Sequence, residues 1–278
     1  MINDAFYKHW MVVLFIIHHS SFIIHHHLSM SSVWIFIATF FALGALGTAL
    51  ANRGKAIAVQ RERWLKVSMH LLIVVVLVWS IQSAPAVLRA LTMLIFAGGA
   101  WELVRVARQK PQGPGYYLVT ALVAVGVGLG FWQTVTHYEP SQCLYVFLMV
   151  FTFDGFSQIA GQLLGKRPLF PTTSPNKTVE GLAGGAAFAL VTAWLTRDWA
   201  SLQPLESLGA GIVLCAAALS GDYLASAYKR RHGVKDYSAL LPGHGGVLDR
   251  FDSWLMAGSV AGWGLVALVF WYVGVFVF

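Results

Sequence analysis

The chain has 278 residues, of which 57% are hydrophobic and only 11% are charged, and its formal net charge is +7. A water-soluble domain carries roughly 25% charged residues, so this composition excludes a soluble globular protein and predicts an integral membrane protein. In such a chain an excess of Lys and Arg is first a signal of membrane topology, so we expect no nucleic-acid partner.

Apolar runs long enough to cross a bilayer recur along the chain and predict an all-α polytopic membrane protein with about nine transmembrane helices. The first run is the weakest, because it contains "FIIHHSSFIIHHH". These histidines have no acidic or cysteine neighbours, so we assign them no metal, and the role of the segment stays open. The predicted spans are residues 11–29, 32–51, 66–82, 86–106, 116–134, 142–163, 181–197, 206–228 and 253–275.

The loops between these spans predict the orientation. Under this assignment all of the 19 Lys and Arg residues except Arg89 and Arg197 fall on one side of the membrane. The positive-inside rule therefore predicts a cytoplasmic N-terminus and a C-terminus outside.

Two acidic residues lie inside apolar runs, Asp154 in "VFTFDGFSQ" and Asp222 in "AAALSGDYLASAYKRR". An acid at this depth costs about a few kcal/mol, which makes it a functional candidate. A structural explanation stays open for Asp154, because Ser157 and Gln158 lie one helical turn further on. The case for Asp222 is stronger, because helical spacing predicts a shared face that suits a metal ion and phosphate oxygens together. That face carries Asp222, Ser226, Lys229 and Arg230.

The stretch "KDYSALLPGHGGVLDRFD", residues 235–252, comes next. Its Pro and Gly residues exclude a helix in the middle, and such a loop lets backbone N–H groups approach an anion. Asp249 and Asp252 are three residues apart and share a face of the last predicted span. Acids, basic residues and glycines in one segment predict a Mg²⁺–nucleotide site at the cytoplasmic face. Further upstream, Glu102 in "AWELVRVAR" is expected to pair with Arg105 or to face the interface.

Residues 226–252, "SAYKRRHGVKDYSALLPGHGGVLDRFD", closely resemble the signature of the phosphatidate cytidylyltransferase (CDP-diacylglycerol synthase) family. The one departure is Tyr228, where an aliphatic residue or Phe is usual. A second block, "DGFSQIAGQLLGKRPLFPTTSPNKTVEG" at residues 154–181, resembles the family's upstream segment. The resemblance covers the C-terminal half well, whereas residues 1–80 do not match.

The resemblance implies a membrane nucleotidyltransferase that makes CDP-diacylglycerol and pyrophosphate from CTP and phosphatidic acid. The lipid phosphate would attack the α-phosphorus of CTP in line. By analogy Asp222 and Asp249 would bind Mg²⁺, with a second cation such as K⁺ nearby. We expect a bacterial inner-membrane protein with its active site facing the cytoplasm, and include a homodimer among the expected assemblies. Residues 1–110 would be N-terminal transmembrane helices of unassigned role, and residues 111–278 the catalytic bundle.

The same resemblance implies the other site residues. Basic residues would hold phosphates, acids would support the metal or the basic side chains, and Ser226 and His244 would orient a phosphate. The further catalytic candidates are Lys229, Arg230, Lys235, Asp236, His244 and Asp252. The substrate-binding candidates are Asp154, Ser157, Lys177, Thr178, Glu180, Ser226, Gly245, Gly246 and Arg250.

Two other classes of function were weighed. An ion-coupled transporter could use Asp154 and Asp222, but such sites usually lie at a repeat interface near the midplane, and no repeat is visible. An inactive, assembly-type member is disfavoured by the intact set of acids. The sequence does not specify the acyl chains or the lipid backbone, nor does it separate a housekeeping enzyme from a specialised paralogue.

Overall fold

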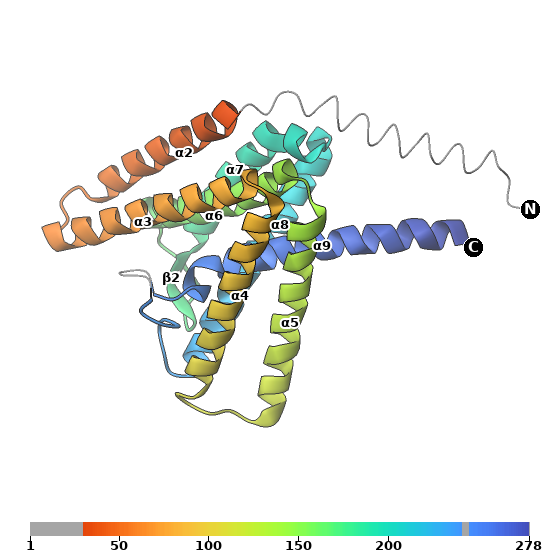
Figure 1. The fold of residues 1–278 in the computed structure, drawn as a ribbon. Coiled ribbons are helices and arrows are strands. Elements are labelled where there is room, and N and C mark those ends of the chain that lie inside the picture. The colour runs from red at the N-terminus through yellow and green to blue at the C-terminus, as the bar shows by residue number, and fades with distance from the viewer. Residues whose placement is uncertain (1–29, 241–244, 278) are drawn as a thin grey trace, which may run out of the picture. The chain divides into compact units, whose positions relative to one another are not determined.

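The computed structural model describes residues 30–240 and 245–277 (Figure 1). Among these residues, seven helical segments are long and apolar enough to cross a membrane, so the chain is an all-α polytopic membrane protein. The helices are α2 (Met30–Ala51), α3 (Ile57–Gln82), α4 (Pro85–Ala107), α5 (Pro114–His137), α6 (Pro140–Leu164), α7 (Val179–Thr196), the short 3₁₀ helix η1 (Arg197–Ala200), α8 (Pro204–Arg231) and α9 (Leu248–Val277). The two strands are β1 (Pro168–Phe170) and β2 (Ser174–Thr178).

Eight of the predicted spans, from 32–51 to 253–275, coincide with the helices α2 to α9 in order, the span at 181–197 ending in η1. The remaining predicted span, 11–29, lies outside the described residues. The chain divides into two compact units, residues 1–42 and 43–278. Of the first unit the structure describes only the beginning of α2, and the site lies in the second.

Two features of the sequence explain where the helices begin and why apolar side chains remain exposed on them. Pro stands in the first turn of α4, α5, α6 and α8, where its missing N–H and fixed φ suit a helix start. In hydrocarbon a helix satisfies its own backbone groups, so apolar side chains can remain uncovered. One such stripe on α5 is more than half exposed, as expected for a surface that contacts lipid. It consists of Leu118, Leu122, Val125 and Leu129.

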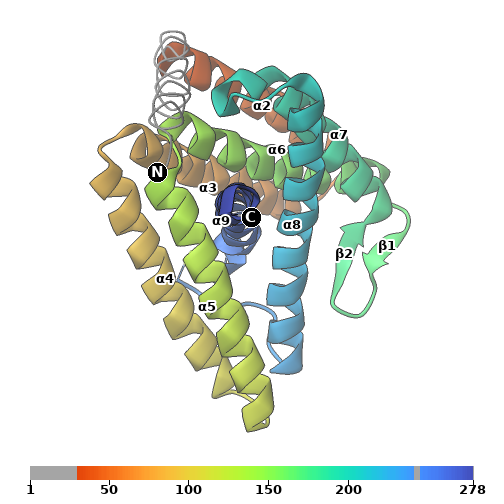
Figure 2. The ribbon, with the colours of Figure 1, turned by 90° about the vertical axis from the view of Figure 1, so that its right-hand side faces the viewer.

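Helix α9 is the central helix of the second unit. It packs against α5 and α8 and also contacts α4 and α6, and Figure 2 shows these helices around its axis. Gly221 makes the approach of α8 to α9 possible. A Cβ atom at this position would lie 2.5 Å from the carbonyl oxygen of Asp252 and 2.6 Å from Cβ of Met256. The first turns of α9 are therefore held close to the middle of α8.

A two-stranded hairpin connects α6 to α7, which the all-α prediction did not include. The strands are antiparallel, and Pro168 pairs with Thr178. The ring of Phe170 packs on Tyr223 of α8 at a centroid distance of 4.7 Å. Nε of Arg230, also on α8, donates a hydrogen bond of 3.1 Å to the carbonyl oxygen of Thr173. The hairpin therefore lies beside α8, as Figure 2 also shows.

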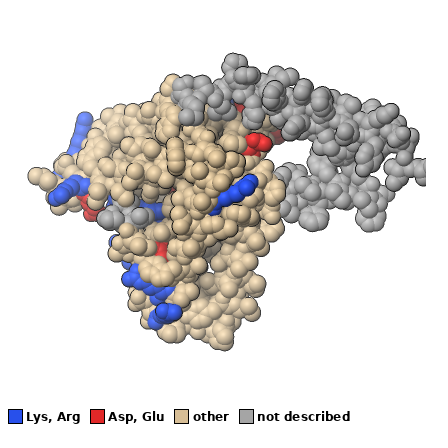
Figure 3. Space-filling view, in the orientation of Figure 1, with Lys and Arg blue, Asp and Glu red and all other residues tan. Residues whose placement is uncertain are grey.

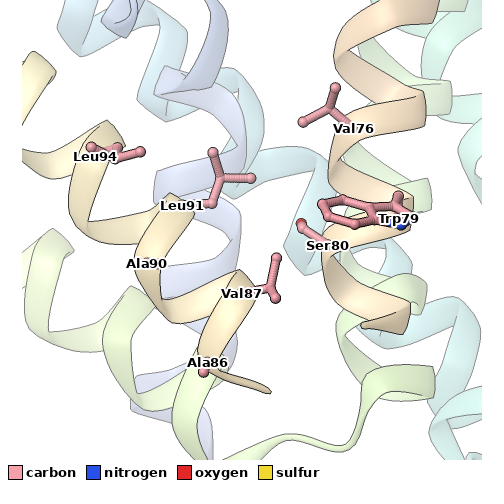
Figure 4. Close-up of a pocket in the computed structure, with 8 residues that line it drawn as sticks. All are labelled: Val76, Trp79, Ser80, Ala86, Val87, Ala90, Leu91 and Leu94. Atoms are coloured by element: carbon pink, nitrogen blue, oxygen red, sulfur yellow. The ribbon is translucent and has the colours of Figure 1, made fainter. Parts of the chain in front are cut away.

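The face of the molecule shown in Figure 3 is largely uncharged. Lys, Arg, Asp and Glu occupy a few places on it and leave broad uncharged areas between them. A groove of about 440 Å³ lies between α3 and α4 (Figure 4). Its lining is almost entirely apolar and therefore suits hydrocarbon better than a nucleotide. The lining residues are Val76, Trp79, Ser80, Ala86, Val87, Ala90, Leu91 and Leu94.

Candidate active site

The end of α8 and the start of α9 are joined by a buried ion pair. Nζ of Lys229 lies 2.5 Å from Oδ1 of Asp249, and the two side chains are only 10% and 4% exposed. The other carboxylate oxygen, Oδ2, accepts backbone hydrogen bonds from Tyr237 (2.8 Å) and Gly246 (2.7 Å). Asp249 therefore holds the residues before and after the loop segment 241–244, in addition to Lys229.

Tyr237 closes one side of this ion pair. Its ring lies 5.2 Å from Nζ of Lys229, and its hydroxyl donates to the carbonyl oxygen of Ala225 at 3.2 Å. Burial raises the pKa of the Tyr237 phenol, and the nearby carboxylates of Asp252 and Asp249 raise it further. The phenol thus stays neutral and acts as an apolar wall with one hydrogen-bond donor.

A second ion pair connects the hairpin to α8. Nζ of Lys177, on β2, lies 2.5 Å from Oδ2 of Asp222. Burial would lower the pKa of Lys177, but the carboxylates of Asp222 and Asp154 outweigh it and raise the pKa above 10.5. Asp252 lies close enough to Asp222 and Asp154 for their charges to interact. One ammonium group, that of Lys177, is thus paired with Asp222 and interacts electrostatically with the two further predicted acids Asp154 on α6 and Asp252 on α9.

Glu102 is the functional candidate that the sequence analysis missed. The expectation that it pairs with Arg105 or faces the interface is wrong, because Glu102 is fully buried and Arg105 lies over the ring of Trp101. Its Oε1 accepts hydrogen bonds from Ser238 Oγ (2.5 Å) and the Val247 N–H (2.9 Å). Its Oε2 accepts one from the Leu248 N–H (2.8 Å). An acid within an apolar run was the signal that could have identified it.

Tyr228, the departure from the family signature, has a structural partner. Its hydroxyl donates a 2.9 Å hydrogen bond to the carbonyl oxygen of Leu103 on α4, next to Glu102. Its ring packs in a buried cluster with Val106 and Tyr237. The larger residue therefore helps to hold α4 against the end of α8.

The remaining residues of the signature differ in their surroundings. Ser226 is buried on α8, Arg230 reaches the hairpin and the carbonyl oxygen of Val234, and Lys235 and Asp236 are exposed. Arg250 is exposed and close enough to Asp154 for their charges to interact. Gly245 has φ +80°, a conformation that favours glycine, and a Cβ there would lie 2.6 Å from Oδ2 of Asp249. His244 lies outside the described residues.

The residues of the upstream block mostly stabilise the hairpin and the start of α7. Ser157 lies against Gly185 of α7, with its hydroxyl buried. Thr178 caps α7 by accepting the N–H of Gly181 at 3.1 Å. Glu180 accepts the N–H groups of Lys166 (3.0 Å) and Arg167 (3.1 Å). The contribution of these three residues to substrate binding stays a prediction.

The donor set suits a hard cation. Asp222, Asp249 and Asp252 offer carboxylate oxygens, which Mg²⁺ prefers, and one or two protein carboxylates are enough when water and phosphate supply the rest. Within residues 30–240 and 245–277, no three Asp, Glu, His or Cys side chains are arranged around a common point as metal ligands. Asp222 and Asp249 are each paired with a different ammonium group, so a metal held by both must compete with Lys177 and Lys229.

Comparison with known proteins gives one family match and several similar bacterial proteins. The model of the cytidylyltransferase family matches residues 6–269. The phosphatidate cytidylyltransferase of Staphylococcus aureus (strain COL) is 36% identical over 141 residues, 50% of this chain and 54% of that protein. The protein of the same name from Bacillus subtilis (strain 168) is 37% identical over 144 residues, again 50% and 54%. The chain spans about half the length of the curated relatives it matches. Because the family model covers most of its length, the chain belongs to the cytidylyltransferase family.

Proposed function

We propose that this protein is an integral membrane phosphatidate cytidylyltransferase. It would catalyse attack of a phosphatidic acid phosphate on the α-phosphorus of CTP, which forms CDP-diacylglycerol and releases pyrophosphate. Family membership and the similarity to two bacterial phosphatidate cytidylyltransferases support this proposal. These similarities give no support to the alternative of an ion-coupled transporter.

The observation that carries the proposal is the pairing of Lys229 with Asp249 beside the cluster of Asp154, Asp222, Asp252 and Lys177. Nucleotidyl transfer requires charge neutralisation and in-line positioning more than a protein nucleophile. Ammonium groups beside carboxylates can supply this charge neutralisation, because the ammonium group can bind a phosphate oxygen while the carboxylate binds a cation. The proton of the attacking phosphate needs no protein base, since phosphate monoesters are largely ionised at neutral pH.

Each residue has a proposed part in this reaction. Lys229, Lys177 and Arg230 would bind and orient phosphate oxygens, with Lys235 and Arg250 at the exposed side. The N–H groups of Gly245 and Gly246 would lie near the triphosphate, with Ser226 and His244 orienting one phosphate. Asp236 would keep the basic side chains in place. Asp154, Ser157, Thr178 and Glu180 would form and support the floor of the site.

Asp222 and Asp249 would hold Mg²⁺, with Asp252 supporting them and K⁺ as the candidate for a second cation. Bound Mg²⁺ would neutralise developing negative charge on the phosphates. The part of this chain is to hold the two carboxylates in place, through the ion pair of Asp222 with Lys177 and the hydrogen bonds of Asp249 with the N–H groups of Tyr237 and Gly246.

The proposed topology follows the distribution of basic residues. We infer about nine spans, with the N-terminus and the site at the cytoplasmic face of a bacterial inner membrane and the C-terminus outside. The division into residues 1–110 and a catalytic bundle of residues 111–278, and the homodimer, belong to the same proposal.

One assay tests the reaction. The purified protein, in detergent micelles that contain phosphatidic acid, is supplied with CTP and MgCl₂, and pyrophosphate and CDP-diacylglycerol are quantified. We expect equal amounts of the two products, which depend on Mg²⁺ and on the lipid. Pyrophosphate formation without lipid, or no CDP-diacylglycerol from a folded protein, would contradict the proposal.

A further inference from the structure

We propose that Glu102 is a positioning residue for this active site. Its carboxylate fixes the segments on both sides of residues 241–244, and thereby the position of Asp249 relative to Lys229. The proposal rests on the proposed function for its catalytic part, whereas the anchoring itself can be measured without turnover.

The first argument is the completeness of the hydrogen bonding. Glu102 is fully buried, and its two oxygens accept from a hydroxyl, Ser238 Oγ, and from the backbone N–H groups of Val247 and Leu248. A buried ionised carboxylate is costly unless several donors satisfy it. The three donors lie 136, 145 and 146 residues away in the chain, so this is a long-range connection between α4 and the loop.

The second argument is the space around the carboxylate. A Cβ atom at Gly246 would collide with the carboxylate of Glu102. On α4, a Cβ at Gly99 would lie 2.8 Å from Cδ2 of Leu248, and one at Gly98 would lie 3.3 Å from Cγ2 of Val247. The glycines on both sides allow α4 and the start of α9 to approach closely enough for the three hydrogen bonds.

The third argument connects Glu102 to the reacting groups. Asp249 follows directly after Leu248, and its Oδ2 accepts the N–H groups of Tyr237 and Gly246, neighbours of the residues that Glu102 binds. The two carboxylates therefore hold the same two short segments, residues 237–238 and 246–248, through different hydrogen-bond donors. If the hydrogen bonds of Glu102 are removed, the segments that position Asp249 opposite Lys229 are no longer fixed to α4.

The test compares Glu102→Gln, Glu102→Asp and the wild type with Glu206→Gln as a matched control. Glu206 is exposed in the first turn of α8, at the opposite end of that helix from Lys229, so its variant makes the same change of charge away from the site. We expect kcat per folded protein to fall by about 10- to 100-fold in Glu102→Gln, because displacement of reacting groups by about 1 Å has effects of this size. The KM for phosphatidic acid should change by less than about twofold, and Glu102→Asp should recover part of the rate because it keeps the charge.

Hydrogen exchange measured by mass spectrometry supplies the readout that does not need activity. In Glu102→Gln, the peptide that contains Val247 and Leu248 should exchange faster by about tenfold or more, while peptides from α6 and α7 stay unchanged. If the wild type makes no CDP-diacylglycerol but this exchange result holds, the proposed function fails and the anchoring stands. A kcat within twofold of the control, or unchanged exchange at 247–248, overturns the positioning proposal.

A second variant keeps the proposal testable if Glu102→Gln does not fold. Ser238→Ala removes only one of the three donors to Glu102 and leaves the two backbone N–H groups in place. We expect the same pattern in weaker form, with a lower kcat, an unchanged KM for the lipid and faster exchange at 247–248. A loss of thermal stability alone, with normal kcat per folded protein, would assign Glu102 and Ser238 a merely structural part.

Discussion

Lys229 and Asp249 form an ion pair of 2.5 Å across the loop that separates α8 from α9, and both side chains are almost completely buried. The bilayer-spanning part of the chain thus carries a charge pair that is neutral as a unit. The ammonium of Lys229 has three N–H donors, so a phosphate could share it with Asp249 or draw it away from the Asp249 oxygen. The second arrangement would leave that carboxylate oxygen for a cation.

Asp249→Asn should abolish measurable turnover and also destabilise the protein. Removing one partner of a buried ion pair costs about 3–5 kcal/mol, because the other charge stays buried. The Asn side-chain oxygen can still accept the N–H groups of Tyr237 and Gly246. The double variant Lys229→Met/Asp249→Asn should therefore recover much of the thermal stability in detergent but none of the activity. A single variant with normal turnover would remove Asp249 from the mechanism.

Gly221→Ala should separate α8 from α9. Its Cβ would meet the backbone of Asp252 and the side chain of Met256, and such overpacking costs about 1–3 kcal/mol. Gly209→Ala on the same helix is the control, because a Cβ there meets nothing within 4 Å. Helix propensity alone favours Ala over Gly by about 1 kcal/mol. We thus expect a lower melting temperature for Gly221→Ala and an unchanged or higher one for Gly209→Ala; equal effects would contradict the close packing.

Ala239→Cys should report the side of the membrane that the site faces. Ala239 is exposed, while the two native cysteines, Cys143 and Cys215, are buried. In sealed right-side-out vesicles a membrane-impermeant maleimide should leave this cysteine unlabelled until the vesicles are opened. Ala84→Cys, in the turn between α3 and α4, should be labelled at once. The reverse pattern would overturn the proposed topology and the route by which CTP reaches the site.

Lys177→Met should lower the rate by about 100-fold, the size of effect seen when one charge-stabilising donor is removed. The pKa of Lys177 lies above its ordinary value of 10.5, so its contribution is complete below that pH and is lost only as the pH rises through the folded-state pKa. The ratio of wild-type to variant rates should therefore stay constant between about pH 7.5 and 9.5. A wild-type advantage that already declines within this range would show that Lys177 is not held charged by Asp222 and Asp154.

The positions of the helices could be predicted from the sequence because each follows from a local apolar run. The residues at which the helices begin and end could be predicted less well. The span predicted at 253–275 begins five residues earlier, at Leu248, where Glu102 accepts the N–H groups of Leu248 and of the preceding Val247. The hairpin at 168–178 escaped prediction because its strands are short and contain prolines, and its position depends on Phe170 and Arg230 contacting other elements.

The residues of the site could be named from the signature, but their partners could not. The helical spacing of Asp222, Lys229 and Arg230 predicted a common face. In the structure Asp222 and Arg230 contact the hairpin, whereas Lys229 contacts α9. These pairings depend on elements distant in the chain, which no local pattern encodes. Glu102 was misassigned for the same reason, since Arg105 is only three residues away, whereas the actual partners are more than 130 residues away in the chain.

Because α9 packs against helices that precede it in the chain, these helices are synthesised before their common partner. The ribosome completes α4, α5, α6 and α8 before α9 emerges, so each enters the bilayer while the helix that will join them is still unmade. Until then the glycines at 98, 99, 130 and 221 lack the residues of 247–263 that they contact, and Glu102 and Lys229 lack the partners that the start of α9 supplies. The proposed active site can therefore form only after α9 has been synthesised and has left the insertion machinery. A nascent chain that lacks α9 carries Asp154 and Asp222 but cannot pair Lys229 with Asp249.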